Sequence, residues 1–441
     1  MKVPSVAALF CLFLACSDPV DPSVLAGYRS TILISVDTLR ADHLGVYGYE
    51  RDTTPNLSRF FAKGTLFERG TSSAPCTTPS VAQFITGSFT PDLETPRLAE
   101  RLRSQGVRTA AFTNQSRFSD EGMGIALGFD TYENSPSRGR ITSQLTDHSI
   151  EWLRENHDKG PLFLWVHYFT PHDPYNPPDR FRVFDDFPTN YEDGDRDRIL
   201  KTYQGKNETF VDSPETEHLV FQRKWKSQGQ VFDETEIDNF VALYDGEILY
   251  ADYEIGRLLD ELDDLGLTER SLVFMTSDHG EWLGESHLWD HCMSLHQREI
   301  HVPLLMRAGD RDHSKKTRVT HPVSTLDIAP TVLDWQGIDQ GNSKLIGTSL
   351  IGEESHPGVV AFWHDQMIVM DENWKLYYAD GPVALFDLSQ DPFEKNNLLE
   401  FEPHRAEEMS RTAEAHNALG KKMNTESEQI IERLKAIGYL N

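Results

Sequence analysis

The sequence has little positive charge: 42 Lys and Arg residues stand against 70 Asp and Glu residues, giving a formal net charge of −28. Proteins that bind nucleic acid gain affinity by neutralising phosphates with Lys and Arg, and this chain has the opposite balance. We therefore expect no nucleic-acid partner. An anionic substrate would have to be attracted by a local cationic site, against the field of the whole protein.

The sequence also lacks long heptad arrays, short repeats and low-complexity tracts, so nothing in it indicates a coiled coil or a repeat architecture. Its 441 residues, 38% of them apolar, suffice for one large α/β domain and a smaller second domain.

The apolar stretch at the N-terminus is too short to cross a bilayer as a retained helix and is typical of a signal peptide. Phe13–Cys16 resembles the lipoprotein box of bacteria. We therefore expect residues 1–15 to be a lipoprotein signal peptide, Cys16 to carry a lipid, and residues 16–28 to form a tether linker. This predicts an exported bacterial lipoprotein, held to a membrane by its lipid anchor, in the outer membrane or periplasm or at the cell surface. A plain secreted protein is the alternative.

Two apolar runs end in acidic side chains. Thr31–Val36 leads into Asp37, and Ser271–Ser277 leads into Asp278, which His279 follows. Such runs predict strands buried on both faces, as in parallel sheets, whose carboxyl ends meet at one ligand-binding edge. Two carboxylates and an imidazole there would suit one divalent ion, Mn²⁺ or Zn²⁺ more than Ca²⁺. The alternative for either aspartate alone is a helix cap.

Several segments in order, from about Ser30 to about Leu398, are similar to the sulfatase family within the alkaline-phosphatase-like superfamily. These segments are Asp37–Gly48, Thr54–Leu57, Thr77–Gly87, His167–Tyr175, Tyr244–Glu247, Asp278–Glu281, Asp327–Thr331 and Phe386–Leu388.

The resemblance implies an α/β fold: a large, mixed, mostly parallel sheet flanked by helices, plus a small C-terminal antiparallel sheet with a helix. Residues 29–346 would form the catalytic domain and residues 347–441 the C-terminal subdomain. Residues 180–238 are polar, charged and weakly periodic, and we expect them to be an insertion or lid that determines substrate choice. A solvated loop is the alternative for that stretch.

The nucleophile segment departs from the family pattern, which reads Cys-x-Pro-Ser-Arg and then Thr-Gly, with the Cys oxidised to formylglycine. The pairs Pro79–Ser80 and Thr86–Gly87 set the register in this chain. They place Thr77, rather than Cys76, at the nucleophile position, and Val81 where the Arg should be. We therefore expect no formylglycine and direct attack by a metal-activated Thr77 hydroxyl. The alternative is that Thr77 merely caps a helix beginning near Pro79.

The resemblance also assigns ligands. Asp37, Thr77, Asp278 and His279 would hold one divalent ion, and Thr38, at a position where many sulfatases have a second Asp, is a weaker candidate. Superfamily relatives with a Thr nucleophile are mostly phosphodiesterases and phosphotransferases, which favours phosphorus over sulfur at this position.

Further residues are assigned to the substrate. His172 in the Pro-His-x-Pro-Tyr segment and His291 after Glu281 would assist the leaving group as proton donors. Asn114, His167 and Lys375 are candidate substrate-binding residues. The alternatives are a turn-forming Asn114, a merely structural His172 and a Lys375 exposed at the surface.

Cys76 and Cys292 both flank active-site segments, so a disulfide between them is possible in an oxidising compartment.

These observations predict a metal-dependent hydrolase that cleaves sulfate or phosphate esters of extracellular glycans, lipids or small molecules by in-line attack of Thr77. Two alternatives stay open. One is a transferase that moves a phospho-headgroup onto a cell-surface glycan or lipid, and the other is a non-catalytic, glycan-binding lipoprotein.

Overall fold

A computed structural model describes residues 29–91, 93–119, 124–135, 142–184, 234–309, 317–340, 345–351 and 358–416. The expected signal peptide, the lipidation site Cys16, the tether and most of the expected lid lie outside the described residues. No helix within the described ranges is both long enough and apolar enough to span a membrane.

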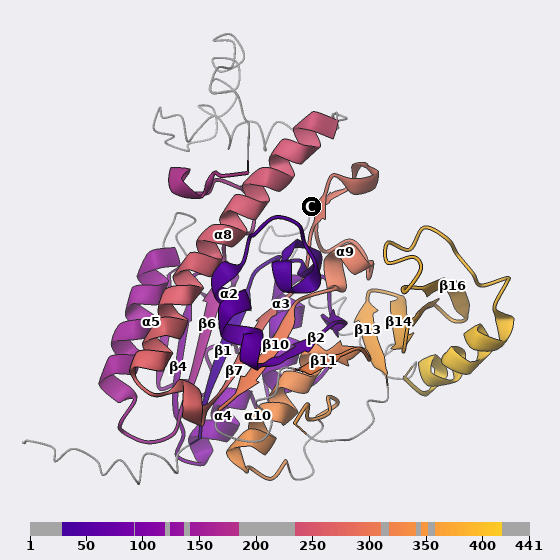
Figure 1. Ribbon diagram of the computed structural model, residues 1–441. Helices are drawn as coiled ribbons and strands as arrows, with labels where there is room; N and C mark the ends of the chain where they lie inside the picture. The colour runs from indigo at the N-terminus through magenta and orange to yellow at the C-terminus, as the bar shows by residue number, and fades with distance from the viewer. Residues whose placement is uncertain are drawn as a thin grey trace, which may run out of the picture.

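An eight-stranded sheet forms the centre of the molecule (Figure 1). Its strands, in spatial order, are β11 (Thr317–Val319), β2 (Thr65–Phe67), β10 (Leu304–Ala308), β7 (Ser271–Ser277), β1 (Ser30–Val36), β6 (Leu162–Tyr168), β4 (Arg108–Thr113) and β5 (Thr131–Asn134). Strand β10 pairs antiparallel with both of its neighbours, whereas every other pairing is parallel. The predicted large, mixed, mostly parallel sheet is therefore confirmed.

Helices cover both faces of this sheet (Figure 1). On one face lie α2 (Pro55–Phe60), α5 (Thr142–Asn156) and α8 (Glu234–Asp264), and on the other lie α3 (Thr77–Thr86), α4 (Leu98–Ser104) and α10 (Ile328–Gln336).

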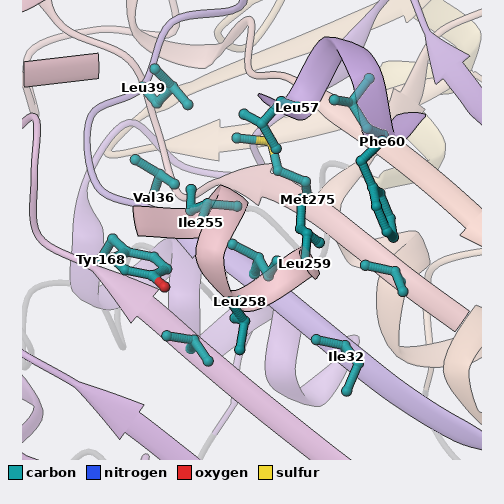
Figure 2. Close-up of a cluster of buried hydrophobic side chains, with 14 of the residues drawn as sticks. Ile32, Val36, Leu39, Leu57, Phe60, Tyr168, Ile255, Leu258, Leu259 and Met275 are labelled. Atoms are coloured by element: carbon teal, nitrogen blue, oxygen red, sulfur yellow. The ribbon is translucent and has the colours of Figure 1, made fainter. Parts of the chain in front are cut away.

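Strand β1 shows why the sheet needs both layers of helices. Its side chains alternate between the faces, with Ile32 and Ile34 in the first core and Leu33 in the second. Figure 2 shows part of the first core, where Ile32 and Met275 from the sheet pack near Leu258 of α8. Burying each such side chain contributes about 1.5–3 kcal/mol. These two cores fix the positions of β1, β6 and β7, which lie side by side.

The C-terminal part is an antiparallel sheet of β13 (Val359–Trp363), β14 (Gln366–Asp371), β15 (Trp374–Tyr378) and β16 (Pro382–Asp387). A helix over residues 403–416 packs on it, with Ala406, Met409 and Ala413 in the shared core. The predicted small sheet with a helix is confirmed, and the predicted domain boundary after residue 346 stays a prediction.

Candidate active site

The carboxyl ends of three adjacent strands meet at one point. In the parallel register, Ser35 of β1 pairs with His167 of β6, and Asp37 follows directly after β1. Asp278 follows β7, the other neighbour of β1. Asp37, His167 and Asp278 are fully buried, and each offers a ligand atom within 4.8 Å of the other two. The edge that the two apolar runs predicted therefore carries a cluster that could hold a metal ion.

Polar atoms at this edge lack hydrogen-bond partners within the described part of the chain. They are Asp37 Oδ1, Thr38 Oγ1, His167 Nε2 and Asp278 Oδ2. Burying a carboxylate oxygen without a partner costs desolvation free energy, and a bound cation would offset that cost.

The spacing of these groups suits one ion. His279 Nε2 lies 3.8 Å from Asp37 Oδ1 and 3.6 Å from Asp278 Oδ2, which is too long for a hydrogen bond. Because bonds from zinc to nitrogen or oxygen are about 2.0–2.2 Å long, atoms at this separation can be ligands of one ion. The donor set of two carboxylates and two imidazoles fits Zn²⁺ or Mn²⁺ better than Ca²⁺.

Thr77 is the first residue of α3, and its hydroxyl reaches this cluster. Its Oγ1 lies 3.1 Å from His279 Nε2, and the side chain is buried. The N-cap position of α3 belongs to Cys76, and α3 has no side-chain cap hydrogen bond. Capping therefore does not account for Thr77, whose hydroxyl faces the potential metal ligands instead.

A disulfide joins Cys76 to Cys292, as the sequence had suggested, across 216 residues with the Cα atoms 4.7 Å apart. It links the segment that carries Thr77 to the segment that carries His291. The sulfur of Cys76 is consumed in this bond.

Active-site histidines share one feature: a protein atom holds Nδ1, which leaves Nε2 for the site. The Nδ1 partners are Gly280 O for His279 at 2.8 Å, Ser35 Oγ for His167 at 2.8 Å, Asp173 O for His172 at 2.8 Å and Glu281 Oε1 for His291 at 3.1 Å. Such anchoring fixes ring orientation, as is usual for metal ligands and catalytic histidines.

The electrostatics separate the roles of these groups. Burial favours neutral Asp37, yet the positive charge of His172 keeps the pKa of Asp37 below its usual value. Burial and the nearby charge of Asp37 raise the pKa of Asp278. Burial lowers the pKa of His279, which keeps it neutral as a metal ligand must be.

The two predicted proton donors behave differently from His279. Although burial opposes its charged form, the carboxylates of Asp37 and Asp173 raise the pKa of His172 to about 10. For His291, burial opposes the charged form, but the hydrogen bond that its ring donates to Glu281 raises the pKa of His291 above its usual value. His172 is therefore charged near neutral pH, and the shift of His291 is in the same direction, which favours the proton-donating form of both imidazoles.

Two of the predicted substrate-binding residues are fully buried, and their contact with substrate stays a prediction. His167 is fully buried, and its Nε2 lies 3.8 Å from Asp37 Oδ2, within the potential ligand cluster. The alternative of a surface-exposed Lys375 is wrong: its Nζ is buried and donates to Leu295 O at 2.5 Å and to Glu394 Oε1 at 2.9 Å. The ion pair with Glu394 and the hydrogen bond to the Leu295 carbonyl therefore satisfy the buried ammonium group.

Asn114 lies at the end of β4, where its Oδ1 accepts a hydrogen bond from the Phe169 backbone at 2.8 Å. It thus connects β4 to the loop after β6, and its contact with substrate stays a prediction. The next residue, Gln115, was missed: its Nε2 donates to Asp37 Oδ2 at 2.7 Å. Its position just beyond a strand of the same edge was the available signal.

Glu281 and Tyr175 were also not assigned roles from the sequence. Glu281 is buried and accepts hydrogen bonds from His291 and from the Tyr175 hydroxyl. Glu281 and His291 are ten residues apart, but Tyr175 lies 106 residues before Glu281, so no local pattern could reveal its contact.

Comparisons with known proteins agree with this geometry. Residues 29–338 match the sulfatase family model. A choline-sulfatase of Rhizobium meliloti (strain 1021) is 29% identical over 312 residues, covering 67% of this chain and 54% of that protein. The multifunctional alkaline phosphatase superfamily protein PehA of Trinickia caryophylli is 25% identical over 291 residues, covering 57% of this chain and 54% of that protein. The chain thus spans about half the length of these curated relatives.

Solved structures share the fold. One, of a protein in complex with its substrate D-glucosamine-2-N,6-O-disulfate, superposes with a TM-score of 0.73 at 19% identity, covering 90% of this chain and 98% of the other. The phosphonate monoester hydrolase of Agrobacterium radiobacter gives a TM-score of 0.66 at 20% identity, covering 89% and 96%. With a family match over most of its length and the ligand cluster at the expected sheet edge, the chain belongs to the sulfatase family.

Proposed function

We propose that the protein is a metal-dependent ester hydrolase in which Thr77, unmodified, attacks a phosphate ester in preference to a sulfate ester. The observation that carries the proposal is the contact of Thr77 Oγ1 with His279 Nε2 at 3.1 Å, beside carboxylate oxygens that lack partners. The disulfide also supports the proposal, because a Cys76 sulfur bonded to Cys292 is not a free thiol that could be converted to formylglycine.

A divalent ion held by Asp37, Asp278 and His279 would lower the pKa of the Thr77 hydroxyl and stabilise negative charge on the substrate. The chain supports the same chemistry with its own groups. Thr77 begins the ten-residue helix α3, whose N-terminal end carries partial positive charge that favours an alkoxide. His172 and His291 are placed to protonate the departing oxygen.

The preference for phosphorus rests on what surrounds the nucleophile. Val81, at the position where the family pattern has Arg, is buried in the second core, so it supplies no cation to the site. A threonine nucleophile resembles the phosphoester-cleaving branches of the superfamily. Relatives of this chain include a phosphonate monoester hydrolase and a multifunctional alkaline phosphatase superfamily protein.

A substrate panel tests the proposal. The full-length protein would be assayed with p-nitrophenyl phosphate, bis(p-nitrophenyl) phosphate and p-nitrophenyl sulfate, with Mn²⁺, Zn²⁺ or Ca²⁺ added. We expect one of the phosphate esters to be turned over with a kcat/KM at least about 10-fold above that of the sulfate, a transition-state difference of about 1.4 kcal/mol. Faster sulfate turnover that depends on Cys76 would contradict the proposal.

We propose that His167 is a further metal ligand. Ser35 Oγ accepts a hydrogen bond from Trp165 Nε1 at 2.8 Å and lies 2.8 Å from His167 Nδ1. If Nδ1–H donates to the same oxygen, Nε2 carries the lone pair that a metal needs, aimed at Asp37. Many sulfatases have a second Asp at the position of Thr38, and a threonine hydroxyl is a weaker metal ligand than a carboxylate. The Nε2 atom of His167 would make up for that weaker ligand.

His167→Ala is therefore expected to weaken Mn²⁺ or Zn²⁺ binding by at least about 10–100-fold. Mutating a residue that only hydrogen-bonds to a metal ligand already costs about that much, and His167 would be a ligand itself. Metal content after dialysis and titration calorimetry measure this. His301→Gln is the matched control, since His301 Nε2 is 2.9 Å from Glu68 O and lies outside the cluster. Unchanged metal affinity in His167→Ala with a raised KM would instead restore the prediction that His167 binds substrate.

A further inference from the structure

A buried chain of three side chains leads away from the ligand cluster. The Tyr175 hydroxyl donates to Glu281 Oε2, and Glu281 Oε1 lies 3.1 Å from His291 Nδ1. Tyr175 and Glu281 are 5% and 1% exposed, so water cannot replace either contact readily. One oxygen of this buried carboxylate thus contacts the His291 imidazole, and the other is held by the Tyr175 hydroxyl.

His291 stands next to the reacting groups. Its ring centroid is 4.5 Å from that of His279, whose Nε2 contacts Thr77, and 5.0 Å from that of His172. With Nδ1 held by Glu281, Nε2 is the nitrogen left to meet a substrate.

The backbone around His291 is held in a costly conformation. Asp290 and Cys292, on either side of it, have φ angles of 75° and 66°, in the left-handed region that residues other than glycine seldom adopt. The disulfide to Cys76 and a hydrogen bond from Trp363 Nε1 to Cys292 O at 3.1 Å secure this segment. Strain of this kind, maintained by surrounding contacts, gathers at functional sites.

We infer that Glu281 and Tyr175 are positioning residues that hold His291 as the general acid for the leaving group, an inference that rests on the proposed esterase function. Glu281 orients the ring and balances its positive charge, and Tyr175 fixes Glu281. Neither side chain needs to touch the substrate.

The proton balance of the cycle is closed. When the Thr77 alkoxide forms its bond to phosphorus and the bond to the leaving oxygen breaks, His291 Nε2–H gives its proton to that oxygen. The product alcohol departs, and His291 is neutral. Water then attacks the phosphothreonine, His291 takes a proton from that water, and the Thr77 alkoxide and charged His291 are regenerated.

This role makes a prediction that a structural role does not. A nitrophenolate leaves without much help because it is a weak base, whereas an alkoxide is a strong base and needs a proton as it departs. General acid catalysis is worth about 10²–10⁴-fold where it is needed. Loss of the positioning residues should therefore cost more as the leaving group becomes more basic.

The test compares Glu281→Gln with wild type on a series of esters whose leaving groups are p-nitrophenol, phenol and a simple alkyl alcohol. The series uses whichever ester class the wild-type protein turns over. We expect kcat/KM to fall about 10-fold with the nitrophenyl ester and about 10³-fold with the alkyl ester. Tyr175→Phe should show the same trend with smaller losses. In a His291→Ala background, Glu281→Gln should add little, because the two residues act as one unit.

Glu299→Gln is the matched control. Glu299 is also a buried carboxylate of this region, but it accepts from Trp282 Nε1, the Met293 backbone and Ser294 Oγ. Any loss it causes should be the same factor for every leaving group.

The outcomes are distinct. A loss in Glu281→Gln that is uniform across leaving groups would overturn the inference and leave a structural role. Loss of bound metal in Glu281→Gln would also overturn it, since Glu281, Asp290 and His291 together could hold a cation. Wild-type protein that turns over no ester would defeat the proposed function itself, before any variant is compared.

Discussion

Thr77→Ala is expected to lower kcat/KM by at least about 10⁴-fold for the best ester, because removing a covalent nucleophile from an enzyme of this kind costs on the order of 10⁴–10⁶-fold. The variant should still bind metal, since Asp37, Asp278 and His279 are untouched. Steady-state kinetics and metal analysis of the same preparation measure both properties. Thr77→Ser should retain part of the activity, because it keeps a hydroxyl at the same position.

Thr78→Ala is the matched control for this prediction. Thr78 is the next residue of α3, has the same side chain and is also buried, but it has no described contact with the ligand cluster. Its kcat/KM should stay within a few-fold of wild type. Full activity in Thr77→Ala, or a loss equal to that of Thr78→Ala, would show that another group is the nucleophile.

The parts of the site that the sequence could predict are those set by strand ends and by local register. Asp37 and Asp278 follow continuous apolar runs, and parallel strands carry their carboxyl ends to one edge. Thr77 was placed by counting from Pro79–Ser80 and Thr86–Gly87 in the register that the resemblance to sulfatases implies, which needs no tertiary information. These predictions depend on residues within about ten positions of each other, which is the range over which local pattern is informative.

The remaining parts depend on contacts between distant segments. Lys375 is buried by contacts with Leu295, 80 residues earlier, and with Glu394, 19 residues later, which is why the alternative of an exposed side chain is wrong. Glu281 meets Tyr175 across 106 residues, and Gln115 meets Asp37 across 78. The place of His167 follows from its pairing with Ser35, which requires knowing that β6 is the neighbour of β1. Sheet order, rather than propensity, was the missing information.

Asp278→Asn is expected to abolish metal binding while making the metal-free protein more stable. In the metal-free protein, burial and the charge of Asp37 raise the pKa of Asp278, so its ionised form opposes folding. The amide keeps an oxygen for the Thr38 and His279 backbone donors, which lie 3.2 Å and 2.9 Å from Asp278 Oδ1 in the wild-type chain. It also places an N–H where Oδ2 now lacks a partner.

The sign of the pH dependence follows from the raised pKa. A carboxyl whose folded pKa lies above its unfolded value stabilises the fold at low pH, and that contribution is lost as the pH rises through the folded pKa. Without metal, Asp278→Asn should therefore melt above wild type at neutral pH, by about 1 °C per kcal/mol for a chain of 441 residues. The difference should shrink as the pH falls toward the ordinary aspartate pKa of about 3.9.

Adding Mn²⁺ or Zn²⁺ should reverse the order of stability. Ligand at about 1,000 times its Kd stabilises a protein by about 4 kcal/mol, and only the wild type would gain this. Thermal melts with and without metal, across a pH series, measure both effects on stability. Ester turnover should also fall at least about 10³-fold in the variant, because the nucleophile loses its activating ion. A variant that is less stable than wild type without metal, yet melts higher when metal is added, would show that Asp278 holds the fold and not the ion. A variant that is more stable than wild type without metal and less stable with it would show that the carboxylate of Asp278 destabilises the metal-free core. Binding of the cation beside Thr77 would then be the gain that offsets this loss of stability.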